Sequence, residues 1–464
     1  TATAQSGSGY GSYSQARKDL SVKNNAIDLD SFRSDGRLDF ASMGNPYTGS
    51  GFANENVYLH GHIPLAAKGS NANTGLGFNS LMPELADLYQ DGSLAVVSNS
   101  GALIEPVTRN MIDRNTAKLP NFLFAHDHQT AFLSSADAVA NSRTGWAGRM
   151  ADSLGLPTKP MPVGVSFAGV SKMLTGIDTR PLVLGKSLNI EFSAANGSAA
   201  PEHIMRREML LALSGQSGDT IFGERIRNQQ AQQYDDVLTL NSAFRRAPNF
   251  SGTQDPYGNE YFKSPNTGQT QLASPVTSSL MGQLEAIAKA IAVAAENPES
   301  ANQRQVYFAV MPDFDTHSGQ ADRHVKLLRG LSLSLWHFQK GLEHLGLSNN
   351  VTTSVFSEMG RSLTCNYDGT DHGWGAHQLV MGGAVNGGQR IGDLADLRVG
   401  GAGDHSSKGR VIPSTSVDQI HASIANWMGL SDQDLATVFP LLKNFQTENN
   451  QMSSALVNGL MQAS

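Results

Sequence analysis

The chain has 464 residues, which is enough for one large α/β domain with an insertion or for two domains. Only 16% of the residues are charged, the net charge is −7, and Lys and Arg form no cluster. Neither a nucleic-acid-binding protein nor a protein attracted to an acidic membrane surface is therefore expected. The apolar runs are too short to span a membrane, and the single cysteine, Cys365, excludes a disulfide within the chain.

The N-terminal segment is rich in Gly, Ser and Tyr, and we expect a flexible arm at 1–16 ahead of one domain at 17–464. If the arm is ordered, it must pack on another surface, for example a neighbouring subunit. The lightly charged surface also lets copies lie side by side, so we expect a homo-oligomer or a polymer such as a filament. The chain starts at Thr1 rather than Met. This suits a secreted, extracellular or periplasmic protein whose export signal has been removed, and equally an arbitrary start.

A helix followed by a buried strand is predicted between residues 80 and 101. Leu81, Leu85 and Leu88 recur on one face of the helix, and the apolar run LAVVSNSG follows it. A helix leading into a buried strand is typical of an α/β fold.

Residues 119–130 place His126, Asp127 and His128 straight after an apolar run. These residues either line an active site or begin a helix in which Asp127 accepts hydrogen bonds from free amides. The sequence leaves both interpretations open.

Residues 170–275 carry few periodic signals and many Asn, Gln and Ser residues. We expect them to form an insertion or cap over the sheet, with helices near 202–214 and 222–243. Substrate specificity would reside in this region.

A strand–helix–strand unit is predicted at 305–356. Runs rich in β-branched and aromatic residues at 305–311 and 351–356 flank a long segment in which Leu and Val recur at helical spacing. Such a unit places its two strands parallel and next to each other.

Acidic, basic and imidazole side chains follow both strands, at the point where each strand ends. They are Asp313, Asp315, His317, Glu358 and Arg361, joined by His372 from a later Gly-rich loop. Ligands of open α/β sheets bind outside the carboxyl ends of the strands, so we expect these side chains to converge. Carboxylates and imidazoles together form sites for divalent metals such as zinc, manganese or calcium. A hydrogen-bonded loop network that holds no ion is the open alternative.

Several short motifs occur in the order typical of one family. They are LAVVSNSG, LFAHDHQ, TGWAGRMAD, DFDTH, SEMGR, DHGWGAHQLVMGGAV and GRVIPSTS. On these motifs the chain resembles the domain of unknown function 1501 family, whose members are usually exported and are placed in the alkaline-phosphatase and sulfatase superfamily. The resemblance runs from about Leu81 to Phe445, which is most of the chain.

The resemblance implies an α/β, alkaline-phosphatase-like fold, with a mixed, largely parallel sheet sandwiched by helices and the insertion or cap at 170–275. It also implies a site in which one or two divalent metals support the cleavage of phosphate or sulfate esters. The metal ligands that it implies are Asp315, His317, Glu358 and His372, with Asp313 as an alternative to Asp315.

The resemblance also implies catalytic roles for His126 and Arg361, because Arg361 could hold an anionic ester substrate through two hydrogen bonds. The chain departs from the family at three places. Ala125 stands where members commonly have Ser, Glu358 and Met359 stand where Asp and Phe are usual, and the turn at 43–46 lacks a metal-binding acid. Loss of a nucleophile alone typically lowers an enzyme's rate by several orders of magnitude.

Two functions therefore compete. In the first, the chain keeps the fold, has lost catalysis at the nucleophile position, and builds an extracellular or cell-surface assembly, with the divalent metal absent. In the second, it is a metal-dependent phosphate or sulfate ester hydrolase in which water replaces the missing Ser.

Overall fold

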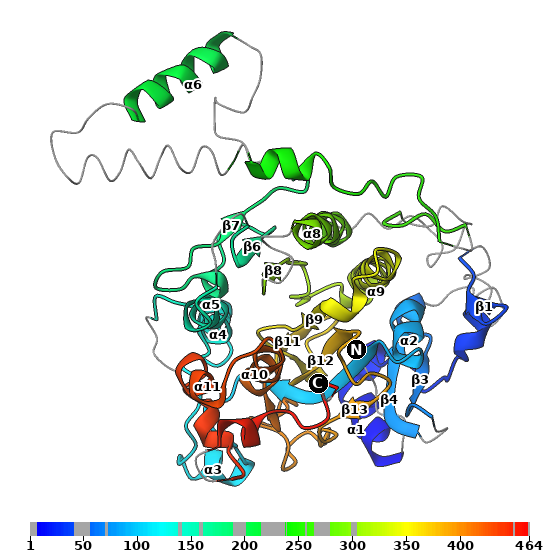
Figure 1. Ribbon diagram of the computed structural model, residues 1–464. Helices are drawn as coiled ribbons and strands as arrows, with labels where there is room; N and C mark the ends of the chain where they lie inside the picture. The colour runs from blue at the N-terminus through cyan, green and yellow to red at the C-terminus, as the bar shows by residue number, and fades with distance from the viewer. Residues whose placement is uncertain are drawn as a thin grey trace.

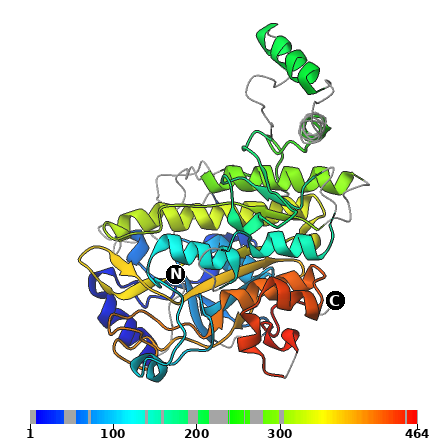
Figure 2. The ribbon, with the colours of Figure 1, turned by 90° about the vertical axis from the view of Figure 1, so that its left-hand side faces the viewer.

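The computed structural model describes residues 7–40, 56–69, 73–137, 142–156, 161–188, 201–214, 237, 239–255, 258–263, 279–297, 304–448 and 451–462. Within these residues, a sheet lies between two groups of helices (Figure 1, Figure 2).

The central sheet has five strands and mixes both pairing directions. β12 (Ala376–Gly382) lies between β5 (Leu94–Gly101) and β9 (Thr352–Val355) and runs antiparallel to both. At the other edge of β5, β13 (Arg390–Ile391) and β14 (Thr415–Ser416) pair with it in the parallel direction. Every residue of β5 is buried, which confirms the buried strand predicted from its apolar run.

Alternate residues of β5 face two separate hydrophobic cores. Val96 belongs to one core, and Ala95 and Val97 belong to the other. The first core is covered by α2 (Pro83–Gln90), α8 (Ser279–Glu296) and α9 (Gln320–His344), the second by α5 (Trp146–Ser153), α10 (Val417–Trp427) and α11 (Asp432–Val438). The prediction of a mixed sheet sandwiched by helices is confirmed.

A second sheet contains three parallel strands, in the order β7 (Leu182–Val183), β6 (Gly164–Ser166) and β8 (Val306–Phe308). The predicted pairing of the strands at 305–311 and 351–356 is wrong. β8 forms its ladder with β6, whereas β9 pairs with β12 in the central sheet. The physical reason is that strand pairing is chosen by packing between distant segments: β8 packs on β6 and β9 on β12, and residues of both strands line a cavity.

The smaller elements of the described chain form three antiparallel pairs and two short helices. They are β1 (Arg33–Ser34) with β2 (Arg37–Leu38), β3 (His62–Ala66) with β4 (Asn73–Asn79), β10 (Arg361–Cys365) with β11 (Thr370–His372), α3 (Arg109–Asp113) and α4 (His126–Ser135).

Of the arm expected at 1–16, the structure describes the residues from Gly7 on. Residues Gly7–Arg17 form α1, in which the Tyr10 hydroxyl donates to the carbonyl oxygen of Val22 at 3.0 Å. Tyr13 packs with Leu363 of β10 in a small hydrophobic cluster. These described residues thus form a helix in contact with the rest of the chain, where a flexible segment was expected.

The helix predicted near 202–214 is confirmed as α6 (Pro201–Ser214), whereas most of the helix predicted at 222–243 and the turn at 43–46 lie outside the described residues. Both views place α6 away from the helices that cover the sheet (Figure 1, Figure 2). None of the described helices combines the length and the apolar character needed to cross a membrane.

A fully buried ion pair joins α2 to α9. The carboxylate of Glu84 accepts hydrogen bonds from the guanidinium of Arg329 and, at 2.7 Å, from the hydroxyl of Ser332. Both charged side chains are 0% exposed, so each depends on the other to offset the loss of water.

Asp418, in the first turn of α10, is the second charge placed deep in the core. Burial raises the pKa of its carboxyl from 3.8 to about 7, with Arg149 opposing and Asp137 adding to the shift. Neither carboxylate oxygen has a hydrogen-bond partner among the described residues. The carboxyl is therefore protonated in acid and becomes a buried anion as the pH rises.

We expect Asp418→Asn to stabilise the protein at pH 8 and not at pH 4. Because the pKa of Asp418 is raised in the folded state, protonation of this carboxyl stabilises the fold. This contribution is fully present below pH 3.8 and is lost as the pH rises through about 7. The full effect is up to about 4 kcal/mol, since one pKa unit corresponds to about 1.4 kcal/mol. Urea unfolding of both proteins between pH 4 and pH 8 measures it. If the difference between the urea midpoints of the wild type and the variant stays constant from pH 4 to pH 8, Asp418 does not titrate in the folded protein.

Candidate functional site

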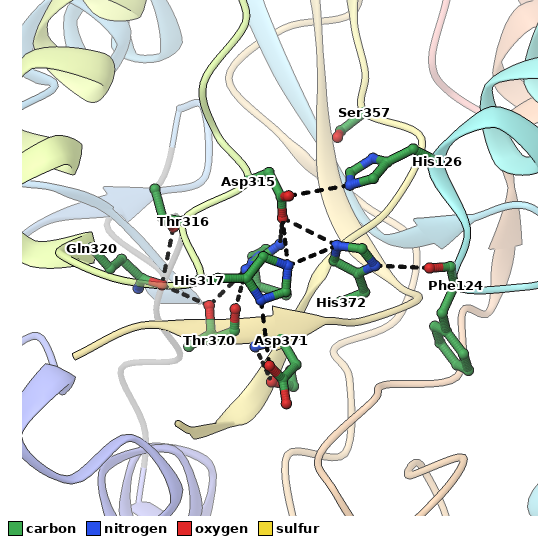
Figure 3. A network of polar contacts seen from close by, with 12 residues as sticks. Phe124, His126, Asp315, Thr316, His317, Gln320, Ser357, Thr370, Asp371 and His372 are labelled. Carbon is green, nitrogen blue, oxygen red and sulfur yellow. Dashed lines mark hydrogen bonds and ion pairs between the residues drawn. The ribbon is translucent and has the colours of Figure 1, made fainter. Parts of the chain in front are cut away.

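Six side chains from five segments meet where β8 and β9 end (Figure 3). Asp315 and His317 lie in the segment between β8 and α9, and Glu358 follows β9. The other three are His126 at the start of α4, Arg361 at the start of β10 and His372 at the end of β11. We call these six residues the polar cluster. The convergence expected at the strand ends is therefore present.

The carboxylate of Asp315 lies at the centre of the polar cluster. Its Oδ1 is 3.0 Å from Nε2 of His317 and 3.1 Å from Nε2 of His372, and its Oδ2 is 3.3 Å from Nε2 of His126. Donor atoms of His126, Asp315 and His372 all lie within 4.8 Å of one another. Three imidazoles thus present the same ring nitrogen to one carboxylate (Figure 3).

The outer nitrogens of His126 and His372 are held by protein acceptors, and that of His317 lies near a carboxylate. Nδ1 of His126 lies 2.7 Å from Oε1 of Glu358, and Nδ1 of His372 lies 2.8 Å from the carbonyl oxygen of Phe124. Nδ1 of His317 lies 3.4 Å from Oδ1 of Asp371. Such partners orient the ring and direct Nε2 toward the centre, as they do for histidines that bind metals.

The hydrogen bonds of the imidazoles indicate whether a cation fits between them and the Asp315 carboxylate. A carbonyl oxygen can only accept, so Nδ1 of His372 must donate to Phe124, and in the neutral ring Nε2 then carries a lone pair. That Nε2 lies 3.0 Å from Nε2 of His317 and close to the Asp315 carboxylate. Electron pairs gathered this closely need a proton or a cation between them. Two or three imidazoles with a carboxylate suit zinc or manganese better than calcium, which prefers oxygen ligands.

The charges of the polar cluster are coupled. Burial lowers the pKa of His126, but the hydrogen bond and charge of Glu358, together with Asp315, outweigh it and leave that pKa above its ordinary value. Burial raises the pKa of Asp315, but Arg361 and the neighbouring imidazoles outweigh it and leave that pKa below its ordinary value. Asp315 is therefore an anion across the physiological range, which suits a ligand for a cation.

Arg361 positions Asp315. One Nη contacts the Asp315 carboxylate, the other contacts the carbonyl oxygen of Thr370, and Nε donates to the Thr370 hydroxyl at 3.1 Å. Three of the five N–H groups of the guanidinium are thus engaged by the protein. The role expected for Arg361, in holding an anionic substrate, stays a prediction, and two of its N–H groups are left for that role by these contacts.

Asp313 does not belong to the polar cluster in the described contacts. Its backbone has a φ of 79°, and its carbonyl oxygen accepts from Nη2 of Arg323 at 3.0 Å. Asp315 is accordingly the carboxylate around which the imidazoles gather, and the alternative placement at Asp313 is not supported.

Ala125 is the N-cap residue of α4, directly before His126, and it makes no side-chain cap. A helix does begin here, with Asp127 in its exposed first turn. His126, the first residue of that helix, also lies in the polar cluster, so the two interpretations of this segment do not exclude each other. Ala125 lies beside the polar cluster but has no hydroxyl that could attack a substrate.

Three residues that contact the polar cluster, Phe124, Thr370 and Asp371, were not among the predicted site residues. The carbonyl oxygen of Phe124 had no sequence signal, because every residue carries one. Asp371 stands next to His372 in the sequence and could have been found, since a carboxylate commonly orients a functional imidazole.

A family model described as "Protein of unknown function (DUF1501)" matches residues 67–441. The match includes all six residues of the polar cluster. No curated protein and no solved structure matches the chain.

Proposed function

Since this chain belongs to the DUF1501 family of proteins of unknown function, we propose that its polar cluster is the active site of a metal-dependent hydrolase that cleaves phosphate or sulfate esters. The same proposal includes kinship with the alkaline phosphatases and sulfatases. The observation that carries it is the meeting of three imidazoles on the Asp315 carboxylate at the carboxyl ends of β8 and β9.

The residues that would hold the metal are His126, Asp315 and His372, with His317 beside them. A divalent cation supplies Lewis acidity and lowers the pKa of water. Arg361 fixes the orientation of the Asp315 carboxylate, and Glu358 fixes the ring of His126. These contacts hold the charged groups in place before a substrate arrives, which favours catalysis by electrostatic preorganisation.

His317 stands beside these ligands, with its side chain 45% exposed and its Nδ1 3.4 Å from Oδ1 of Asp371. Since its Nε2 lies 3.0 Å from Nε2 of His372, it would serve as a further ligand of the metal. Because Ala125 has no hydroxyl, water attacks the ester directly and no covalent intermediate forms on that residue.

Metal removal and return tests the proposal. Protein dialysed against a chelator should bind one zinc or manganese ion per chain, measured by elemental analysis and calorimetry. It should hydrolyse p-nitrophenyl phosphate or p-nitrophenyl sulfate only after the metal is restored. Absence of binding at micromolar metal, together with absence of turnover of both esters, would exclude a hydrolase.

A non-catalytic assembly protein is the second candidate, and two observations favour it. Ala125 removes the nucleophile, and α6 lies away from the body with the side chains of Met205 and Met209 68% and 62% exposed. Exposed apolar side chains on a projecting helix can serve self-association. If light scattering shows polymers while the chain binds no metal and cleaves no ester, this second function replaces the hydrolase.

A further inference from the structure

The polar cluster opens into a cavity of about 1340 Å³ that continues between β8 and β9. His126, Asp315 and Glu358 line it at the polar cluster, and residues of both strands line it farther in. The helices α8 and α9 supply apolar walls through Leu280, Leu284, Ile287, Leu328, Leu331 and Leu335. The cavity therefore has the charged polar cluster at one end and apolar side chains along its walls.

A cavity of this size is unusual for a packed core. Pockets that hold drug-sized ligands are roughly 300–1,000 Å³. The space is therefore large enough for a long alkyl chain, and apolar side chains of α8 and α9 line it.

His421 of α10 is a second, independent sign of a ligand. Its side chain is 1% exposed and lines the cavity, and neither ring nitrogen has a hydrogen-bond partner among the described residues. The ring is stacked on Trp146 at 4.8 Å between centroids and meets the edge of Phe356 at 4.7 Å. A buried imidazole without a partner calls for a hydrogen-bonding group on the molecule that fills the space.

We propose that the cavity binds the apolar part of an amphiphilic ester, a long-chain alkyl phosphate or sulfate whose anionic group lies at the polar cluster. The proposal rests on the proposed function and adds the class of substrate to it. The charged end selects the anion, and the apolar walls select the length of the chain. His421, in the wall of the cavity, could donate to a polar substituent on the chain, which the unsubstituted alkyl series does not require.

Calorimetry with n-alkylphosphonates from ethyl to decyl tests this proposal, because phosphonates bind like the esters and are not cleaved. The metal-loaded protein is used, at ligand concentrations below micelle formation. Kd should fall about fourfold for each added methylene until the cavity is full. A Kd that does not depend on chain length would overturn the proposal.

Variants that fill the cavity distinguish binding of the alkyl chain in the cavity from non-specific hydrophobic binding to the protein surface. In the wild type, the Kd of butylphosphonate should exceed that of octylphosphonate more than a hundredfold. Ile287→Trp on α8 should bring this ratio close to one. If that variant does not fold, Leu331→Trp on α9 tests the same point from the other wall. The matched control is Ile177→Trp, at a side chain that is 72% exposed and does not line the cavity, and it should keep the wild-type ratio. If both filled variants keep the wild-type ratio, the chain binds elsewhere.

The same series distinguishes this inference from the proposed function. Chain-length dependence without cleavage of any ester would leave the binding cavity in place and exclude the hydrolase. Cleavage of short esters with no dependence on chain length would leave the hydrolase in place and exclude the amphiphile.

Discussion

Asp315→Asn should lower kcat/KM for ester hydrolysis by about a thousandfold or more, because the loss of several kcal/mol of charge stabilisation in the transition state corresponds to a rate factor of this size. The amide keeps the shape of the carboxylate but removes the charge to which three imidazoles and Arg361 are directed. Metal affinity should fall with activity, since an uncharged amide is a poor ligand for zinc or manganese.

The matched control for this variant is Asp322→Asn, the same change at an exposed carboxylate in the first turn of α9. Asp322 lies outside the polar cluster and does not line the cavity. Its kcat/KM and its metal stoichiometry should stay near those of the wild type. Equal losses at both positions would indicate a general effect of removing a negative charge, and undiminished activity in Asp315→Asn would place the chemistry elsewhere.

Glu84→Gln should destabilise the fold by about 3–5 kcal/mol, which is the loss typical of breaking a buried ion pair from one side. The substitution leaves the guanidinium of Arg329 charged and 0% exposed after its carboxylate partner is gone. The hydroxyl of Ser332 also loses its charged acceptor. Urea unfolding followed by circular dichroism measures the change.

Two comparisons make the result for Glu84 specific. Glu343→Gln removes a carboxylate that pairs with Lys340 at 3.0 Å but is 36% exposed, and pairs of this kind contribute less than about 1 kcal/mol. The double variant Glu84→Leu with Arg329→Met removes both buried charges and should recover most of the stability. A loss in Glu84→Gln no larger than that in Glu343→Gln would mean that the buried pair contributes little.

Periodicity and strand ends predicted the parts of this molecule that depend on local sequence. The apolar run at 94–101 could only be a strand covered on both faces, and it is β5. The leucines between 320 and 344 recur at helical spacing, and they form α9. The expected meeting of Asp315, His372 and Glu358 is also found, although Asp315 and Glu358 follow strands of two different sheets and His372 ends a strand of a third, rather than all three following neighbouring strands of one sheet.

The parts that failed depend on long-range partners. Nothing in the run at 305–311 shows that β8 pairs with β6 rather than β9, because pairing is chosen by packing between segments far apart in sequence. Residues 7–17 have the composition of a flexible segment, yet Tyr10 and Tyr13 find acceptors and apolar partners on the body. The departure of Asp313 from the polar cluster arises from its positive φ, which spacing alone does not reveal.

Serine is an alternative to Ala125 that mutation reaches easily. Every alanine codon becomes a serine codon by one base change, and serine is among the best residues for the start of a helix, where alanine contributes no acceptor for the free amides of α4. A serine at position 125 could therefore cap α4 without a cost to folding, yet the chain places no hydroxyl at this point beside His126.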